Sequence, residues 1–288
     1  MPGLLEIRPI VPDDALVSLL NSVHGTSMSL SGFLGNTQTC SGLHPVYLGA
    51  FSQGELAGFN AFIPHRFFQN GREIIAYQSC WTATDPAHRG KGVFSSIIEK
   101  AKVVLKEDFG AKFILGFPNG NSHPIFVKNL RFKDYPLDKL IIGRFPFWEK
   151  YYLRSDQPLT DNGGLYADEQ EIYEWKSREH PGQVHRAVVG DSFAWGMVRG
   201  KTIRGIRLDF LEVGGISLAR AEDLPKLMQG LFSSSKTWFL HVQMHETHPY
   251  HHFFKWSEKG HTLIIYDLDH FFDEKNSFGM MPGIKDTY

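Results

Sequence analysis

Residues 76–105 carry the clearest pattern of hydrophobic and polar positions in the chain. Residues 78–84 are mainly β-branched, aromatic and small, which is typical of a strand, and Asp85 and Pro86 end that strand. After two glycines, apolar residues recur at helical spacing, with charged residues on the opposite face. The apolar face consists of Val93, Phe94, Ile97, Ile98, Ala101, Val104 and Leu105. The pattern predicts a strand, a glycine-containing turn and a helix.

Shorter patterns predict the elements around this unit. Strands are expected over residues 4–8, 46–51, 56–63, 73–77, 111–117 and 140–147, with a helix over 12–23. The strand 111–117 should lie parallel to 78–84, because a helix connects the two. Asn70-Gly71 predicts a tight turn between two strands. Residues 25–43 are rich in Gly, Ser and Thr without a clear period, so we expect a mobile loop or a broken helix there.

The second half of the chain repeats part of this order. Strands are expected over residues 183–189, 192–199, 202–211, 238–243 and 262–267, and helices near 173–176, 221–232 and 249–256. Residues 238–242 match residues 112–116, and the histidine-proline segment from His248 resembles the one that begins at Ser122. This similarity indicates an internal repeat.

Residues 155–164 separate the two halves. This stretch is rich in Asp, Pro, Gly and Asn and has no periodic apolar residues, which is typical of a linker. We therefore predict a first domain over residues 1–154 and a second over residues 165–288.

The predicted helix begins directly after Arg89-Gly90-Lys91-Gly92. The first N–H groups of a helix have no backbone acceptor, and the positive helix end attracts anions. The glycines remove side chains that would keep a phosphate away from the backbone. A P-loop needs Ser or Thr after the lysine, and a dinucleotide fingerprint needs glycine or alanine where Ser95 stands, so neither pattern fits. The turn is a candidate pyrophosphate site, and the alternative is an exposed basic turn without a ligand.

The same turn resembles the acyl-CoA-binding motif of the GNAT acyltransferase superfamily, Arg/Gln-x-x-Gly-x-Gly/Ala, with Phe94 in place of the usual small residue. The resemblance implies an α/β (α+β) fold with two GNAT-like domains, each a mixed, mainly antiparallel sheet flanked by helices. It also implies acetyl-CoA or another short acyl-CoA as cosubstrate. The expected donor-binding residues are Thr82, Ala83 and Thr84 on the strand and Arg89, Gly90, Lys91, Gly92, Val93 and Phe94 in the turn. A backbone N–H of that strand would stabilise the thioester oxygen.

A second signature of the superfamily has a counterpart at residues 117–132. The resemblance implies that Asn121 hydrogen-bonds the pantetheine arm, whereas Asn119 and Asn121 could also simply form the turn. Ser122 is expected to cap the following short helix. Family members usually carry a tyrosine on this helix that protonates the leaving thiolate, but this chain has Phe126 and Val127 there.

Acyl transfer to an amine also needs a group that accepts a proton. We favour His123, because it begins the short helix near the expected meeting point of donor and acceptor, and imidazole titrates near neutral pH. Tyr135 and His245 are further candidates, and loss of the amine proton directly to water is the alternative. Cys80 could act as an acyl-carrying nucleophile, although a small cysteine in a strand is more often a packed core residue.

Composition and residue spacing limit the possible partners, the cellular location and the metal sites of the protein. Thirty basic and thirty-one acidic residues give a net charge of -1, which argues against nucleic acid as a partner, and no apolar stretch is long enough to indicate a membrane span. Two cysteines without a CxxC pair favour a reducing compartment, so we predict a cytoplasmic protein. The histidines at 241, 245, 248, 251 and 252 do not have the spacing of a zinc protease, and we predict no metal site.

Together these features predict an acyl-CoA-dependent N-acyltransferase. Its partner would be a small-molecule amine, and the resemblance points to the amino group of a nucleotide-linked sugar. One alternative is that the acceptor is an aminoacyl group or a peptide. Another is that the protein is a non-catalytic acyl-CoA sensor. The second copy has an acidic turn without glycines at residues 218–223, so we expect it to lack the cofactor and to shape the acceptor pocket.

Overall fold

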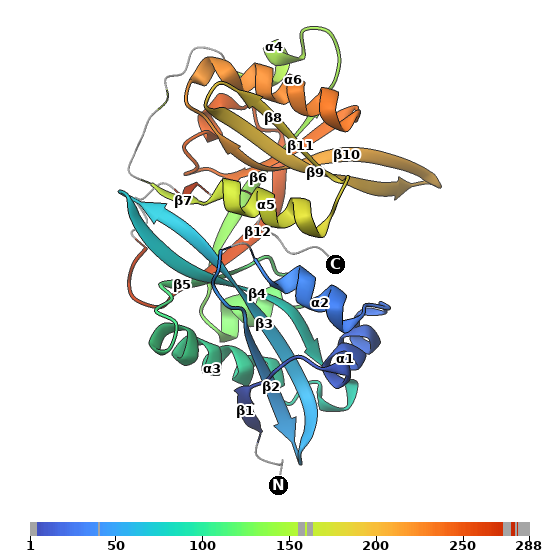
Figure 1. Cartoon of the computed structure of the whole chain (residues 1–288), viewed down its shortest axis with the longest axis vertical. Helices are drawn as coiled ribbons and strands as arrows, with labels where there is room; N and C mark the ends of the chain where they lie inside the picture. Colours follow the sequence, from blue (N-terminus) through green and yellow to red (C-terminus); the bar gives the residue numbers. More distant parts are fainter. Residues whose placement is uncertain are drawn as a thin grey trace.

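The computed structural model describes residues 5–39, 41–154, 159, 164–272, 278–279 and 281. In this part of the chain, neighbouring strands of one continuous sheet follow the order β1-β2-β3-β4-β5-β12-β6-β11-β10-β9-β8, with β7 paired to β3 and β13. Helices lie on both faces of the sheet (Figure 1). The mixed α/β class predicted from the sequence is confirmed.

The first half of the chain supplies one end of the sheet. Its elements are β1 (Glu6–Pro9), α1 (Asp14–His24), α2 (Leu30–Thr37), β2 (Val46–Ser52), β3 (Glu55–Gln69), β4 (Arg72–Thr84), η1 (Pro86–His88), α3 (Val93–Glu107), β5 (Phe113–Gly116), η2 (Ile125–Asn129), β6 (Lys133–Gly143) and α4 (Trp148–Tyr152).

The second half supplies the other end. Its elements are β7 (Leu165–Ala167), α5 (Glu169–Glu179), β8 (Val184–Val189), β9 (Ser192–Ile203), β10 (Ile206–Ser217), η3 (Ala221–Asp223), α6 (Leu224–Ser235), β11 (Phe239–His245), η4 (His251–Phe253), β12 (Glu258–Asp267) and β13 (Phe278–Gly279). Most of the predicted linker, residues 155–158 and 160–163, lies outside the described residues.

Local signals that the sequence carries are realised as expected. Asn70 and Gly71 have φ values of 50° and 73°, which suits the tight turn between β3 and β4. β5 pairs with β4 in parallel, as the intervening helix requires. In the 25–43 segment, Gly25 ends α1 and the side chain of Ser29 caps α2 by accepting from the Gly32 N–H, so the broken-helix expectation is correct.

Helix α3 buries the predicted apolar face against the first half of the sheet. Val93, Ile97, Ile98, Ala101 and Leu105 share one buried cluster with residues of β2 and β3. Full burial of an aliphatic side chain of this size stabilises the fold by about 1.5–3 kcal/mol. The packing therefore fixes where the first turn of α3 lies relative to β3 and β4.

Gly58 on β3 permits the close approach of that first turn. A Cβ atom at Gly58 would lie 2.5 Å from Val93 Cγ1 and 3.2 Å from the Ala83 carbonyl oxygen. Replacing Gly58 with alanine is therefore expected to lower the free energy of unfolding by about 1–3 kcal/mol, because Val93 must move away from the sheet. Chemical denaturation measures this. Unchanged stability of Gly58→Ala would contradict the packing described for α3.

Strands β6 and β12 exchange partners between the two halves. β12 comes from the second half, yet it pairs antiparallel with β5, with Ile264 opposite Gly116. β6 comes from the first half, yet it pairs with β11, with Ile142 opposite Leu240. The two strands also pair with each other. Each half is thus completed by a strand of the other.

The strand predicted over residues 140–147 is wrong at both ends, because it starts and ends later than the observed strand. β6 starts at Lys133 and ends at Gly143, and residues 148–152 form α4. The early part of β6 contains charged residues and Pro136, and Leu137 is its first buried apolar residue. The hydrophobic pattern is therefore weak where this strand begins.

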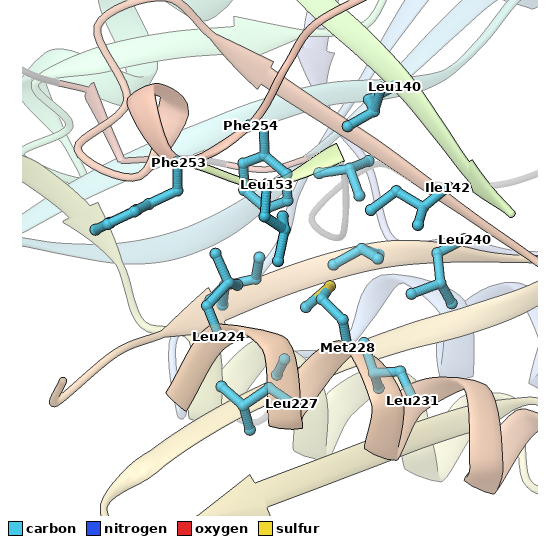
Figure 2. Close-up of a cluster of buried hydrophobic side chains, with 14 of the residues drawn as sticks. Leu140, Ile142, Leu153, Leu224, Leu227, Met228, Leu231, Leu240, Phe253 and Phe254 are labelled. Atoms are coloured by element: carbon cyan, nitrogen blue, oxygen red, sulfur yellow. The ribbon is translucent and has the colours of Figure 1, made fainter. Parts of the chain in front are cut away.

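The core of the second half includes side chains from the first half. Leu224, Leu227, Met228 and Leu231 of α6 face Leu240 of β11 and also Leu140 and Ile142 of β6 (Figure 2). Leu153, Phe253 and Phe254 close the same cluster. Because β6 is buried here, the second core depends on a strand of the first half.

The two halves share one irregularity, as an internal repeat would. β4 has one extra residue relative to β3 near Trp81, and β10 has one extra residue relative to β9 at Gly214. In each half, parallel pairing to the next strand stops just before this bulge. Bulges commonly end pairing and redirect the chain next to binding sites.

Candidate functional site

The turn before α3 presents unpaired backbone amides. Gly90 and Gly92 have φ values of 72° and 76°, and Gly92 caps the helix without a side-chain hydrogen bond. Among the described residues, the N–H groups of residues 90–95 donate to no protein acceptor, and the Ser96 N–H is the first to donate, to the Gly92 carbonyl at 2.9 Å. The start of this long helix can therefore hold an anion through its backbone.

An open edge of β4 leads away from that turn. β4 pairs with β5 only through Ala76, Tyr77 and Gln78, so residues 79–84 have β3 on one side and, within the described chain, no paired strand on the other. Trp81 adopts a φ of 51° within this stretch. An extended chain can add to such an edge through main-chain hydrogen bonds. The edge begins earlier than the sequence-based choice of Thr82, Ala83 and Thr84.

The side chain of Thr82 serves the fold. Its hydroxyl hydrogen-bonds Asn60 Oδ1, which also accepts from Ser79 Oγ at 3.3 Å. Ala83 is buried, and Thr84 pairs with Gly58. Any role of these residues toward a donor would therefore come from their backbone.

Phe94 has a clear packing role in the turn. Its ring contacts that of Phe126 edge-on, with centroids 5.1 Å apart, and Phe126 contacts Phe132 in the same way at 4.8 Å. This ring contact packs η2 against the first turn of α3. Phe94, which departs from the family motif, thus packs against Phe126. Phe126 lies in η2, the segment where family members usually carry a tyrosine.

The turn after β5 is held by Asn119. Its Oδ1 atom accepts the backbone N–H groups of Asn121 and Ser122, both at 3.0 Å. Ser122 Oγ accepts from the Asn119 N–H and not from an N–H of η2, so the expected helix cap is wrong. Asn121 is exposed, and no hydrogen bond of its side chain occurs among the described residues. Asn119 is therefore the turn-forming residue, and Asn121 stays a predicted donor contact.

His123 has a charged partner that the sequence did not reveal. Its Nε2 atom lies 2.7 Å from Asp134 Oδ1, and both side chains are partly exposed. A carboxylate on one ring nitrogen orients the imidazole and stabilises the positive charge that the ring carries after taking up a proton. Asp134 lies on β6, eleven residues away, and no local motif links the two positions. The pair is suited to accept a proton from a neighbouring substrate group.

Tyr135 and His245 lie together but apart from His123. Their ring centroids are 5.4 Å apart. Because successive side chains of a strand point to opposite faces, Tyr135 lies on the other face of the sheet from Asp134. His245 Nδ1 accepts from the Thr247 N–H at 3.3 Å, and burial lowers the pKa of His245. These two candidates therefore do not join the His123 pair.

Cys80 and the histidine cluster have structural surroundings. Cys80 is buried, and its thiol lies 3.6 Å from the Ala61 carbonyl oxygen. His248 accepts from the Tyr250 N–H, and His251 hydrogen-bonds Asp138 at 2.9 Å. Within the described part of the chain, no three His, Cys, Asp or Glu side chains converge as metal ligands do.

The equivalent turn of the second half is closed by protein groups. Asp223 accepts from Ser192 Oγ at 2.8 Å and pairs with Arg220 at 3.1 Å. The Leu224 N–H donates to the Ala221 carbonyl, and α6 has a proline in its first turn. At α6, the N–H groups of residues 223 and 224 are therefore engaged, and residue 225 is a proline without one.

No helix among the described residues is long and apolar enough to span a membrane.

Comparison with known proteins agrees with this geometry. Residues 41–129 match the family described as acetyltransferase (GNAT) domain, and this range contains the turn, the open edge of β4 and η2. Residues 41–129 therefore carry a GNAT acetyltransferase domain. No curated protein matches its sequence.

Solved structures show the same fold over nearly the whole chain. Eis1 from Mycobacterium abscessus is 11% identical with a TM-score of 0.59, covering 92% of this chain and 74% of that one. GCN5-related N-acetyltransferases from Anabaena variabilis and Kribbella flavida are 9% and 12% identical, with TM-scores of 0.60 and 0.58. Each covers 92% of this chain, which covers 73% and 72% of them. The fold similarity thus extends well beyond residues 41–129.

Proposed function

We propose that the chain transfers an acetyl or other short acyl group from coenzyme A to a primary amine, with the donor held between α3 and the open edge of β4. The observation that carries this proposal is the set of unpaired N–H groups at residues 90–95. Arg89 and Lys91 add positive charge beside them. The diphosphate of the donor would lie against these amides.

The pantetheine arm would extend along residues 79–84 as an added strand. No strand of the described chain occupies this edge, and Asn121, in the turn after β5, has no side-chain hydrogen bond among the described residues. A backbone N–H of the bulged segment at Trp81 would hydrogen-bond the thioester oxygen as negative charge develops on it. Side chains need only position the amine and move its proton.

His123 would accept that proton. The amine nitrogen bonds to the thioester carbon, the carbon–sulfur bond breaks, and the nitrogen loses one proton, which the imidazole takes up while Asp134 stabilises its positive charge. The departing thiolate can then be protonated from the same imidazolium. Phe126 and Val127 offer no hydroxyl for this step.

For the acceptor we propose the amino group of a nucleotide-linked sugar, in the cytoplasm. The motivation is the resemblance of the segment from Phe117 to Ser122 to acyltransferases of that kind. An aminoacyl or peptide acceptor is the competing class.

Thiol release tests the function directly. The purified chain is mixed with acetyl-CoA and either nucleotide-linked amino sugars, free amino sugars, amino acids or short peptides, and free thiol is followed with a chromogenic disulfide. We expect release that depends on a nucleotide-linked amino sugar. Binding of acetyl-CoA by calorimetry without release across the whole panel would overturn the catalytic proposal, and release with peptides alone would overturn the acceptor assignment.

Substitution of His123 tests its role. His123→Asn is expected to lower kcat by about 10²–10⁴-fold with little change in acetyl-CoA affinity, because only proton transfer is lost. Asp134→Asn should lower kcat by about tenfold, since Asp134 orients the His123 ring through their hydrogen bond. His88 makes a similar pair with Asp85 at 3.4 Å, so His88→Asn is a matched control. Equal effects of His88→Asn and His123→Asn would contradict this assignment.

A further inference from the structure

A cavity of about 330 Å³ opens in the second half, beside the bulged end of β10. It is lined by residues of β3, β7, β9, β10 and β13, the start of α5 and the turn after β11. Figure 1 places β7 and α5 between the two halves of the molecule. The volume lies at the lower end of the range for small-ligand sites, about 300–1,000 Å³.

This cavity is separate from the donor turn. Phe68, near one end of β3, lines it, whereas Gly58, near the other end of β3, contacts the first turn of α3. Ten residues of strand correspond to roughly 33 Å.

Glu169 is the principal charged group of the cavity. Its Oε2 atom accepts from Trp195 Nε1 at 3.0 Å, and its Oε1 atom has no hydrogen-bond partner among the described residues. A Cβ atom at Gly215 would lie 1.6 Å from Glu169 Oε2, so only glycine leaves room for this arrangement. Burial raises the pKa of Glu169 to about 8. A carboxyl group thus lies in the cavity wall with half of its hydrogen-bonding capacity unused.

The rest of the lining suits a positively charged guest. Four aromatic side chains contribute to it, namely Phe68, Tyr166, Phe193 and Tyr250. Asp168 adds a second carboxylate, and no lysine or arginine is among the described lining residues. His248 also lines the cavity, and burial lowers its pKa to about 3, so it stays neutral. Aromatic rings and a half-buried carboxylate are groups that attract an ammonium ion.

We propose that this cavity binds a small organic cation, a primary or quaternary amine, whose ammonium group pairs with Glu169 and lies among the aromatic rings. The site would be occupied independently of acyl-CoA, because the two sites share no residue. A cation of this kind would draw the carboxyl into its charged form and release a proton when it binds near pH 7.

Trp195 offers a direct readout, since its indole N–H touches Glu169. In spectra of the ¹⁵N-labelled chain, the Trp195 indole signal is identified by its loss in Trp195→Phe. Choline and cyclohexylammonium are titrated, with 3,3-dimethylbutanol and cyclohexanol as neutral molecules of the same shape. We expect saturable shifts of this signal by at least one of the cations, with and without acetyl-CoA, and at least about tenfold weaker effects of its neutral counterpart.

Two variants and a control make the test specific. Glu169→Gln preserves the shape and the hydrogen bond to Trp195, so it should fold, yet cation binding should weaken at least about tenfold. Phe68→Leu, at the partly exposed rim, should weaken it several-fold. Glu222→Gln removes an exposed carboxylate outside this cavity and should leave cation binding unchanged. The proposal is overturned if no cation shifts the Trp195 signal, if the neutral molecules bind equally well, or if Glu169→Gln binds as tightly as the unmodified chain.

Discussion

Replacing Gly92 with aspartate is expected to weaken acetyl-CoA binding at least about 100-fold, a loss of about 2.7 kcal/mol. The new carboxylate would stand among the free amides of residues 90–95, where the diphosphate is proposed to lie, and would repel it. The fold should survive, because a Cβ atom added at Gly92 would have no other atom within 4 Å. Aspartate also tolerates a positive φ better than most residues, at a cost of about 1 kcal/mol. Calorimetry with acetyl-CoA measures the affinity.

The control uses the other end of the same helix. Gly110 also has a positive φ, 65°, and open space around it, so Gly110→Asp introduces the same side chain into the same backbone conformation. Its acetyl-CoA affinity should equal that of the unmodified chain. If Gly92→Asp binds acetyl-CoA normally, or if both variants lose binding alike, the donor does not lie at this turn.

Ending the chain at residue 154 is expected to abolish folding of the first half. β5 would lose β12, and β6 would lose both β11 and β12. Leu137, Leu140 and Ile142 of β6, all buried in the whole chain, would be exposed. At about 1.5–3 kcal/mol for each side chain, this loss is comparable with the entire stability of a typical domain, about 5–15 kcal/mol. The fragment should be insoluble or lack a cooperative unfolding transition by circular dichroism.

Cleaving the folded chain between its two halves tests whether the first half needs the strands of the second half or only its covalent connection to them. A protease site placed between residues 154 and 164, cleaved after folding, should leave the two pieces in a 1:1 complex that still binds acetyl-CoA. The exchanged strands β6 and β12 would hold the pieces together. A monomeric, cooperatively unfolding fragment of residues 1–154 would show that the first half does not need β12.

Local elements were predictable because their signals are local. The strand before Asp85, the helix from Val93 and the Asn70-Gly71 turn depend on periodicity, turn residues and positive φ values that neighbouring residues dictate. The donor turn belongs to this group as well, since its glycines and the helix that follows are adjacent in sequence. The same holds for the acidic turn before α6, whose lack of glycines is visible in the sequence.

Features that depend on contacts between distant segments could not be predicted from the sequence and became visible only in the fold. Asp134 reaches His123 only because β6 returns beside β12, next to β5, and the cavity around Glu169 forms from seven separate segments of the chain. Ser122 was misassigned as a helix cap because Asn119 competes for the same turn.

The amino-acid sequence alone dictated the helix and strand periodicity and the glycine-containing turn at residues 89–92, because these depend on neighbours within a few positions. It also set the net charge of -1, which depends on composition alone. Tertiary structure alone decided how the strands of the two halves pair with each other, because pairing between β5 and β12 or β6 and β11 depends on closing long stretches of chain around shared cores. That pairing brings a carboxylate to His123.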